Sequence, residues 1–340
     1  MTSAGASGRP AAIAVVGSMN IDLVAYARRA PGPGETVIGE RFQSGFGGKG
    51  ANQAVMARLL GAEVSFVGAL GDDLYATMTL ENLATLGVDT AGVMRVAGSS
   101  GVAPIWVEAD GTNRIIVVSG ANDLVSPGHA TAAVAAMARV DVAVGQFEIP
   151  QAATAAGFAA ARARGAVTVL NPAPAAPISP DLLAATQWLI PNEVEFGMLA
   201  GTTGGDDPTD AAFAAFAAMT GTRLVVTLGT RGAAIVARDG TVTRLPADPV
   251  TAIDTTGAGD AFVGAFAVGL ALRLPELDAV SLGIACASDS VTRPGTQASL
   301  PDRDRCAALL AGVRARQSGK GARGTPERDE APPGGRGLGP

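Results

Sequence analysis

Two aspartates flank a run of small residues in DTTGAGDAFVGAF, residues 254–266, ahead of an apolar stretch of helical character. A helix beginning here would present the free amides of Gly257, Ala258 and Gly259 at its positive end, where an anion can approach closely. Asp260 would lose solvation on such a buried helix, and Ser or Thr could cap it at lower cost. A carboxylate beside an anion site indicates proton transfer; a glycine turn with an acidic cap is the plainer interpretation.

A second glycine-rich segment, GFGGKGANQAVMARLLG at residues 45–61, contains Lys49. Apart from Lys320 near the C-terminus this is the only lysine, so a compact ammonium is placed inside a glycine loop. A formal GxGxxG begins at Gly45, but no strand of a βαβ unit leads into it and no acidic residue follows about twenty positions later. The Walker pattern also fails, because Gly50 follows Lys49. The lysine either serves a ligand or is a solvated loop residue.

Composition excludes several classes of protein. With 340 residues, 48% of them hydrophobic, the chain can bury a large core, and its net charge of −6 argues against nucleic acid as a partner. Cys286 and Cys306 form no CxxC pair, and the single His129 excludes a histidine metal cluster. No apolar run reaches the roughly 18 residues of a membrane span, and no signal-like N-terminus is present. We therefore expect no membrane partner and a cytoplasmic location.

Short apolar runs alternate with Ala- and Leu-rich segments of helical length. The runs are AIAVVG at 12, VSFVGAL at 64, DVAVGQF at 141, AVTVL at 166, QWLIP at 187 and RLVVTLG at 223. This pattern predicts an α/β fold, a doubly wound and mostly parallel sheet with helices on both faces. Small, polar or Gly/Pro-rich segments at residues 1–10 and 317–340 predict disordered tails around a domain at 11–316.

Two segments, at about residues 20–46 and 97–120, interrupt that rhythm. The first contains IDLVAYA and ETVIGERFQ, and the second contains GVAPIWVEADGTNRIIVVS, two strand-like runs around an Asp-Gly turn. We expect them to form a small β-sheet that acts as a lid over the strand ends, where α/β folds bind ligands. A hairpin that only extends the sheet edge is the alternative.

Eight segments in this order resemble the phosphofructokinase-B-like carbohydrate kinase family over roughly residues 12–312. They are GSMNID (17–22), PGPGETV (31–37), GGKGANQA (47–54), GDD (71–73), NPAPA (171–175), PNEVE (191–195), TLGTRG (227–232) and DTTGAGDAFVGAF. The resemblance implies phosphoryl transfer from ATP to a sugar hydroxyl, with Asp260 as general base and the 257–259 amides as anion hole. It implies a sugar site made by Asn20, Asp22, Gly48, Lys49, Gly50, Asn52, Glu148 and Asp260. It implies an ATP site made by Asn192, Thr227, Gly229, Thr230, Gly232 and Gly259.

The resemblance also implies two cations and a dimer. Glu195 would organise Mg²⁺ through water, since this hard ion keeps several waters. A K⁺ activator would be held by Asp254, Thr256, Ser290, Arg293, Gly295 and Ser299. The charge of Asp254 would repel a transferring phosphoryl group unless a cation screens it; a helix cap is the alternative. Two chains would pair through their lids as a homodimer.

The substrate implied by the resemblance is D-ribose, phosphorylated at O5 to D-ribose 5-phosphate. A nucleoside, deoxyribose or another sugar remains an alternative, as does a non-catalytic sugar-binding sensor on the same fold. Two positions depart from the family pattern. Ile284 stands where a well-known pattern has an Asn near the adenine, and SGAN at 119–122 lacks the His that often precedes it.

Overall fold

The computed structural model describes residues 9–202 and 207–321. Within them nine strands form the main sheet, in the order β13-β12-β11-β10-β9-β8-β1-β4-β5. The strands are β1 Ala12–Val16, β4 Glu63–Leu70, β5 Asp89–Arg95, β8 Val142–Gly145, β9 Val167–Leu170, β10 Trp188–Leu189, β11 Arg223–Thr227, β12 Ala233–Val236 and β13 Val242–Leu245. Those from β5 to β11 run parallel, while β12 and β13 are antiparallel. The expected mostly parallel, doubly wound sheet is confirmed.

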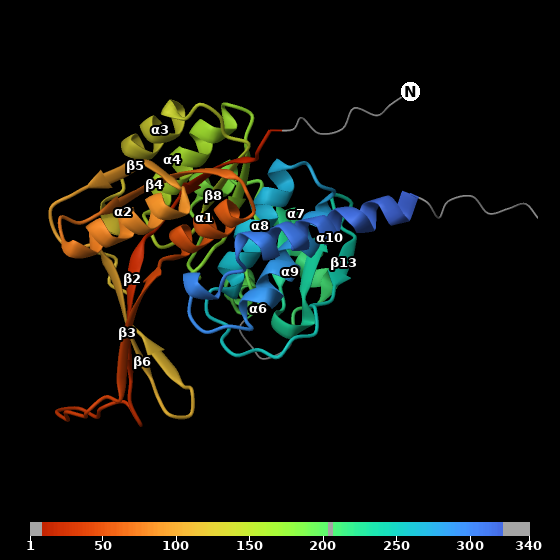
Figure 1. Ribbon diagram of the computed structural model, residues 1–340. Helices are drawn as coiled ribbons and strands as arrows, with labels where there is room; N and C mark the ends of the chain where they lie inside the picture. Colours follow the sequence, from red (N-terminus) through yellow and green to blue (C-terminus); the bar gives the residue numbers. More distant parts are fainter. Residues whose placement is uncertain (1–8, 203–206, 322–340) are drawn as a thin grey trace, which may run out of the picture.

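Helices cover both faces of this sheet (Figure 1). One face carries α1 Lys49–Leu59, α2 Leu74–Leu86, α8 Ala258–Ala271, α9 Glu276–Ser290 and α10 Arg303–Gly321. The other carries α3 Pro127–Ala136, α4 Gln151–Arg162, α5 Pro180–Ala185, α6 Glu193–Ala200 and α7 Asp210–Thr220. Every residue of β1 is buried, and alternate side chains pack into the two different cores. A strand buried on both faces therefore has the continuous apolar sequence observed here.

Four further strands form a separate sheet that projects from the main body (Figure 1), and we call it the lid. Its order is β3-β2-β6-β7, with β2 Asn20–Tyr26, β3 Arg41–Gly47, β6 Gly101–Val107 and β7 Asn113–Ile115. Strand β2 pairs antiparallel with β3 and parallel with β6. Because Asn20 at the start of β2 lies opposite Gly47 at the end of β3, the base of the lid adjoins the start of α1.

Three local predictions differ from the structure. Lys49 is the first residue of α1 rather than part of an irregular loop, because Gly48 adopts a φ of 86° and begins the helix. Residues 36–40 of ETVIGERFQ precede β3 instead of belonging to it, and Ile38 is 89% exposed. Strands β5, β12 and β13 were not anticipated, since they are short or carry polar residues at the sheet edge.

The C-terminal limit also differs, because the expected boundary at residue 316 falls inside α10, which runs to Gly321. Glycine and charge alone do not stop a helix, and no proline follows 316 until residue 326. Of the tails expected at 1–10 and 317–340, residues 1–8 and 322–340 lie outside the described residues. Three 3₁₀ turns complete the described chain, η1 Gly120–Leu124, η2 Gly229–Arg231 and η3 Gln297–Ser299.

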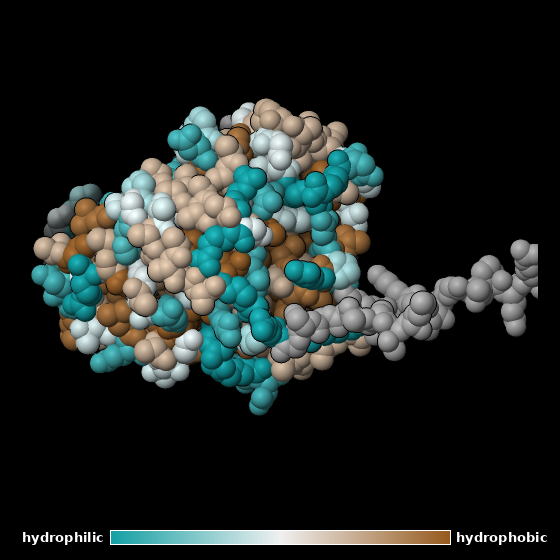
Figure 2. All heavy atoms as spheres, turned by 90° about the horizontal axis from the view of Figure 1, so that it is seen from above, coloured by the Kyte–Doolittle hydropathy of each residue, from teal (hydrophilic) through white to brown (hydrophobic). Residues whose placement is uncertain are grey.

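The surface of the main body mixes hydrophilic and hydrophobic residues over the face drawn in Figure 2. In the described part of the chain, no helix has both the length and the apolar character needed to cross a membrane.

Candidate active site

Asp260 lies in the first turn of α8 and is 4% exposed. Gly257 begins this helix with a φ of 78°, a conformation that favours glycine, and no side chain caps the helix. The Asp260 carboxylate accepts two hydrogen bonds of 2.9 Å, from Asn52 Nδ2 and Gln53 Nε2 in α1. Helices α1 and α8 approach closely at Gly264. A Cβ there would lie 2.6 Å from the Gln53 carbonyl oxygen, so the missing side chain of glycine permits the contact. The apolar helix therefore carries its carboxylate into a polar cluster.

The start of α1 forms one side of this cluster. A Cβ on Gly48 would lie 2.7 Å from the backbone nitrogen of Asn20, so only glycine allows the two segments to pack this closely. The backbone amide of Lys49 donates to Glu148 Oε2 at 2.9 Å, and the Ser18 hydroxyl donates to the same oxygen at 2.6 Å. Glu148 is thereby fixed beside the helix start.

Asn20 and Asp22 reach the same region from β2. Asn122 Nδ2 donates to Asn20 Oδ1 at 2.8 Å, and the Thr296 hydroxyl donates to Asp22 Oδ2 at 3.0 Å. Burial raises the pKa of Asp22 to about 6, against the lowering effect of the Thr296 hydrogen bond, and the negative charges of Glu148 and Asp260 add to the rise. The side of the cluster nearest the lid thus holds several carboxylates.

Next to Asp260 the structure has a cavity of about 210 Å³. It is lined by Lys49, Asn171, Ala173, Ile190, Asn192, Glu195, Thr227, Thr255, Gly257, Gly259, Asp260 and Val263. The cavity therefore brings together residues from the starts of α1, α6 and α8 with others near the carboxyl ends of β9, β10 and β11, where α/β sheets bind ligands.

In this region the carboxylates of Asp260, Glu148 and Glu195 act on one ammonium group, that of Lys49. Burial disfavours the Lys49 ammonium, but the negative charges of Asp260, Glu148 and Glu195 outweigh it, and its pKa is raised. Burial raises the pKa of Glu195 and the charge of Asp260 adds to this, while the Asn192 amide and Lys49 act in the opposite direction. Lys49 is therefore held as a cation among carboxylates.

The segment NEVE, residues 192–195, caps a helix as well as lining the cavity. Asn192 Oδ1 accepts from the Glu195 amide, and Glu195 Oε2 accepts from the Asn192 amide, both at 2.8 Å. This reciprocal pair is a capping box at the start of α6. Helix capping alone could therefore account for both residue types, although both also line the cavity.

The segment after β11 lies only partly at the cavity. Thr227 lines it and forms a bridge to Asn192, whereas Gly229, Thr230 and Gly232 do not line it. Gly229 and Thr230 belong to the exposed turn η2. They follow the end of β11, and Arg231 of the same turn is paired with Glu193 of α6.

Asp254 is not the cap of α8. Its carboxylate accepts from the amides of Thr256 and Gly295, both at 2.9 Å. Burial opposes ionisation, but these amide bonds prevail and lower the pKa of Asp254. The carboxylate thus joins the turn before α8 to the loop after α9.

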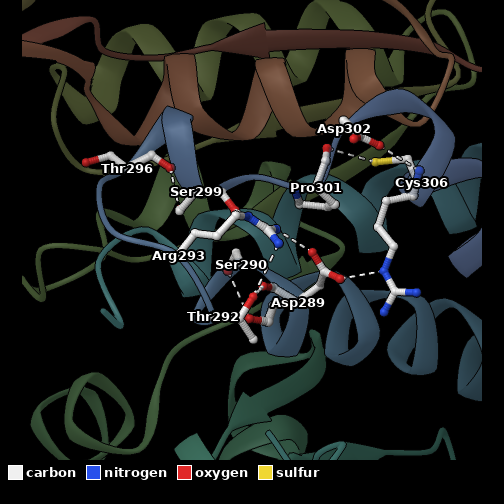
Figure 3. A network of polar contacts seen from close by, with 11 residues as sticks. Asp289, Ser290, Thr292, Arg293, Thr296, Ser299, Pro301, Asp302 and Cys306 are labelled. Carbon is white, nitrogen blue, oxygen red and sulfur yellow. Dashed lines mark hydrogen bonds and ion pairs between the residues drawn. The ribbon is translucent and has the colours of Figure 1, made fainter. Parts of the chain in front are cut away.

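That loop is held by its own polar network, shown in Figure 3. Asp289 is paired with Arg293 and Arg305, and Arg293 Nε donates to the carbonyl oxygen of Ser299 at 3.1 Å. Ser299 Oγ in turn donates to the carbonyl oxygen of Thr296 at 2.8 Å. Ser290 ends α9, where its hydroxyl donates to the carbonyl oxygen of Ala287. Arg293, Gly295 and Ser299 therefore lie on one ordered loop, joined to Asp254 through Gly295.

Across residues 9–202 and 207–321, no group of three or more His, Cys, Asp or Glu side chains could hold a metal ion. At Glu195, the described residues make one hydrogen bond to the carboxylate, at Oε2. A single half-buried carboxylate suits a hard ion that keeps most of its waters. The arrangement fits Mg²⁺ bound together with a phosphate-bearing ligand.

Comparison with known proteins decides the family. The model of the pfkB family of carbohydrate kinases matches residues 10–303. The chain belongs to this family. It is therefore a carbohydrate kinase.

Relatives of this kinase are similar over most of their length. A ribokinase of Schizosaccharomyces pombe is 37% identical over 302 residues, 85% of this chain and 94% of that protein. A deoxyribokinase of Salmonella typhi is 36% identical over 294 residues, 85% of this chain and 95% of that protein. The structure of Arabidopsis thaliana ribokinase complexed with ribose and ATP has a TM-score of 0.81 at 31% identity, covering 89% of this chain and 99% of that one.

Several residues of the candidate site were not predicted from the sequence. Gln53 and Gln146 join Asp260 in one buried network, and Asn171 both joins it and lines the cavity. A usable signal was present, because Gln146 and Asn171 directly follow the apolar strands β8 and β9. Ile284, where a family pattern has Asn, belongs to α9, is 6% exposed and packs in the core.

Proposed function

We propose that this kinase transfers the γ-phosphoryl group of ATP to O5 of D-ribose, giving D-ribose 5-phosphate and ADP. The observation that carries the proposal is the position of Asp260, a buried carboxylate at the start of α8 between the lid-side carboxylates and the cavity. The similarity to ribokinases, one of them complexed with ribose and ATP, supports the substrate pair.

Asp260 acts as the general base in this proposal. It takes the proton of the attacking hydroxyl while the amides of Gly257, Ala258 and Gly259 stabilise charge on the transferring group. Two features support the anion hole, namely the start of the 14-residue helix α8 and the lack, among the described residues, of a side-chain hydrogen bond that caps it. The Ala258 amide donates to the carbonyl oxygen of Thr255 at 3.3 Å, and this long bond would be exchanged for one to phosphate.

The sugar occupies the polar region at the base of the lid. Asn20, Asp22, Asn52 and Glu148 supply acceptors and donors for hydroxyl groups, and Lys49 supplies a cation. A site with this many polar groups discriminates strongly, because an analogue that lacks a hydroxyl leaves one of them buried and unpaired.

The nucleotide extends from the cavity over Asn192, Thr227 and the turn formed by Gly229, Thr230 and Gly232. Mg²⁺ would bind with ATP, and Glu195 would hold it through water. When bound, the ion supplies positive charge against the phosphate oxygens. The protein itself places the Glu195 carboxylate, because the Asn192 backbone amide donates to Glu195 Oε2 and so orients it.

A K⁺ ion would activate the enzyme at the junction of Asp254 with the loop at 290–299, using Thr256, Ser290, Arg293, Gly295 and Ser299. The bond between Asp254 and Gly295 supports this assignment, because it brings the two ligand-bearing segments together. The homodimer through the lids rests on apolar side chains that the lid leaves exposed, among them Phe42 at 65% and Ile115 at 50%.

A coupled assay of ADP release tests the function. D-ribose should give a rate that depends on both ATP and sugar, and the product should carry phosphate on O5. The deoxyribokinase relative makes 2-deoxyribose the main competitor, so both sugars belong in one panel with adenosine. A higher kcat/KM for 2-deoxyribose would reassign the substrate, and sugar binding without ADP release would indicate a sensor.

A further inference from the structure

Both oxygens of the Asp260 carboxylate are held by side-chain amides of two consecutive residues. Asn52 Nδ2 donates to Oδ2 and Gln53 Nε2 donates to Oδ1, each at 2.9 Å. Asn52 belongs to the sugar site proposed above. Gln53 is 1% exposed and does not line the cavity, so its bond to Asp260 calls for a separate explanation.

The Gln53 amide is fixed by three hydrogen bonds. Its Nε2 donates to Asn171 Oδ1 at 3.2 Å as well as to Asp260, and its Oε1 accepts from Gln146 Nε2 at 2.6 Å. Asn171 is oriented in turn, because its Nδ2 donates to the carbonyl oxygen of Ile190 at 2.9 Å. Rotating the Gln53 amide by half a turn would set donor against donor and acceptor against acceptor. Only one orientation of this buried amide is therefore stable.

Asn52 is fixed less tightly. Its Oδ1 accepts from Gln297 Nε2 at 3.3 Å, and Gln297 Oε1 accepts from Asn82 Nδ2 at 3.0 Å. Gln297 belongs to the short turn η3, whereas Gln146 and Asn171 directly follow two adjacent strands of the main sheet. The path through Gln53 thus connects Asp260 to the more rigid part of the fold.

We propose that Gln53 is a positioning residue for the reaction, anchored by Gln146 and Asn171, which holds the Asp260 carboxylate in the orientation that accepts the sugar proton. The inference rests on the proposed role of Asp260 as general base. Proton transfer needs heavy atoms within about 2.6–3.2 Å, and a misplacement of about 1 Å can cost roughly 100-fold in rate. Fixing one carboxylate oxygen leaves the side chain little freedom to turn away.

The test replaces Gln53 by Met, which keeps the length of the side chain and removes the donor. We expect kcat to fall roughly 10- to 100-fold while KM for ribose and for ATP changes much less, since Gln53 lines neither site. Gln146→Met should give a smaller fall of the same kind, because it removes an anchor and leaves the Gln53 donor in place. The matched control is Gln151→Met, which removes a glutamine bonded at both ends of its amide on the far side of the fold, to Ser179 and Pro177.

A double mutant separates this inference from the function on which it rests. If Gln53 acts through Asp260, adding Gln53→Met to Asp260→Asn should lower kcat no further than about twofold. A further tenfold fall in the double mutant would overturn the positioning role, as would a single Gln53→Met variant with wild-type kcat beside an inactive Asp260→Asn. Wild-type turnover by Asp260→Asn would instead overturn the base itself. Circular dichroism and melting temperatures confirm that each variant is folded.

Discussion

Replacing Asp22 with asparagine should stabilise the folded protein at neutral pH while weakening sugar binding. Asn has nearly the same shape, and it can still accept the hydroxyl of Thr296 that Asp22 Oδ2 accepts at 3.0 Å. Shape matters at this position, because Asp22 Oδ1 lies only 2.3 Å from where a Cβ on Gly47 would be. The substitution therefore removes a charge with little change in packing.

The magnitude follows from the pKa of Asp22, which burial and the charges of Glu148 and Asp260 raise from 3.8 to about 6. The folded chain keeps this proton to a higher pH than the unfolded chain. The associated stability is fully present below pH 3.8 and is lost as the pH rises through about 6. At about 1.4 kcal/mol for each pH unit, the difference corresponds to an upper limit of about 3 kcal/mol in the free energy of unfolding.

Urea unfolding of both proteins from pH 4 to pH 8 measures this effect. Asp22→Asn should match the wild type near pH 4 and exceed it above pH 6, while ribose should protect the variant less from unfolding. Glu35→Gln is the control, because hydrogen bonds from Arg29 and the Gly32 amide lower the pKa of Glu35 to about 2, so its neutralisation should bring no gain at pH 7. An Asp22→Asn variant destabilised equally at pH 4 and pH 7 would refute the reasoning.

Four further outcomes are expected. Asp260→Asn should lower kcat by roughly 100-fold or more with the fold retained, and near wild-type turnover would remove the base assignment. Glu195→Gln should raise the Mg²⁺ concentration needed for half-maximal rate, and it should lower the melting temperature slightly because the capping box at the start of α6 is weakened; an unchanged Mg²⁺ requirement would contradict this role. At constant ionic strength K⁺ should raise kcat above the rate in Na⁺ or in a bulky organic cation, and equal rates would exclude the cation site. Adenosine should be a poor substrate beside ribose, which a side-by-side comparison of kcat/KM would contradict if adenosine were favoured.

The central strands of the main sheet could be predicted because burial on both faces restricts their sequences. A parallel strand covered on both faces is apolar at most positions, and the runs that became β1, β4, β8, β9, β10 and β11 are predominantly apolar. Edge strands face a weaker constraint. Strand β13 is a short edge strand with no fully buried residue, so VTRL did not differ visibly from a loop.

The site could be predicted only in part, for a related reason. Asp260 and Lys49 could be recognised because each is a charged residue in an apolar or glycine-rich segment. Burying such a charge is unfavourable, so its presence there indicates a function. The residues that hold them were not, because Gln53 and Gln146 are ordinary polar residues 93 positions apart. Their contact exists only after α1 has packed beside the end of β8. A network assembled from separate elements has no local pattern.

The balance of charge at this site has a consequence for the free enzyme. The charges of Glu148 and Asp260 act on Asp22, that of Asp260 acts on Glu195, and Asp260, Glu148 and Glu195 act on the Lys49 ammonium. Burial and carboxylate charge together raise the pKa values of Asp22 and Glu195. In the proposed function, hydroxyl donors from a sugar would satisfy such carboxylates without adding charge, and a hydrated divalent ion at Glu195 would add positive charge beside the phosphates of ATP. The free site is therefore less stable than it could be with neutral residues. In the proposed reaction, relief of this repulsion would contribute to the free energy of substrate binding, and Asp260 would then be in place to accept the proton of the sugar hydroxyl.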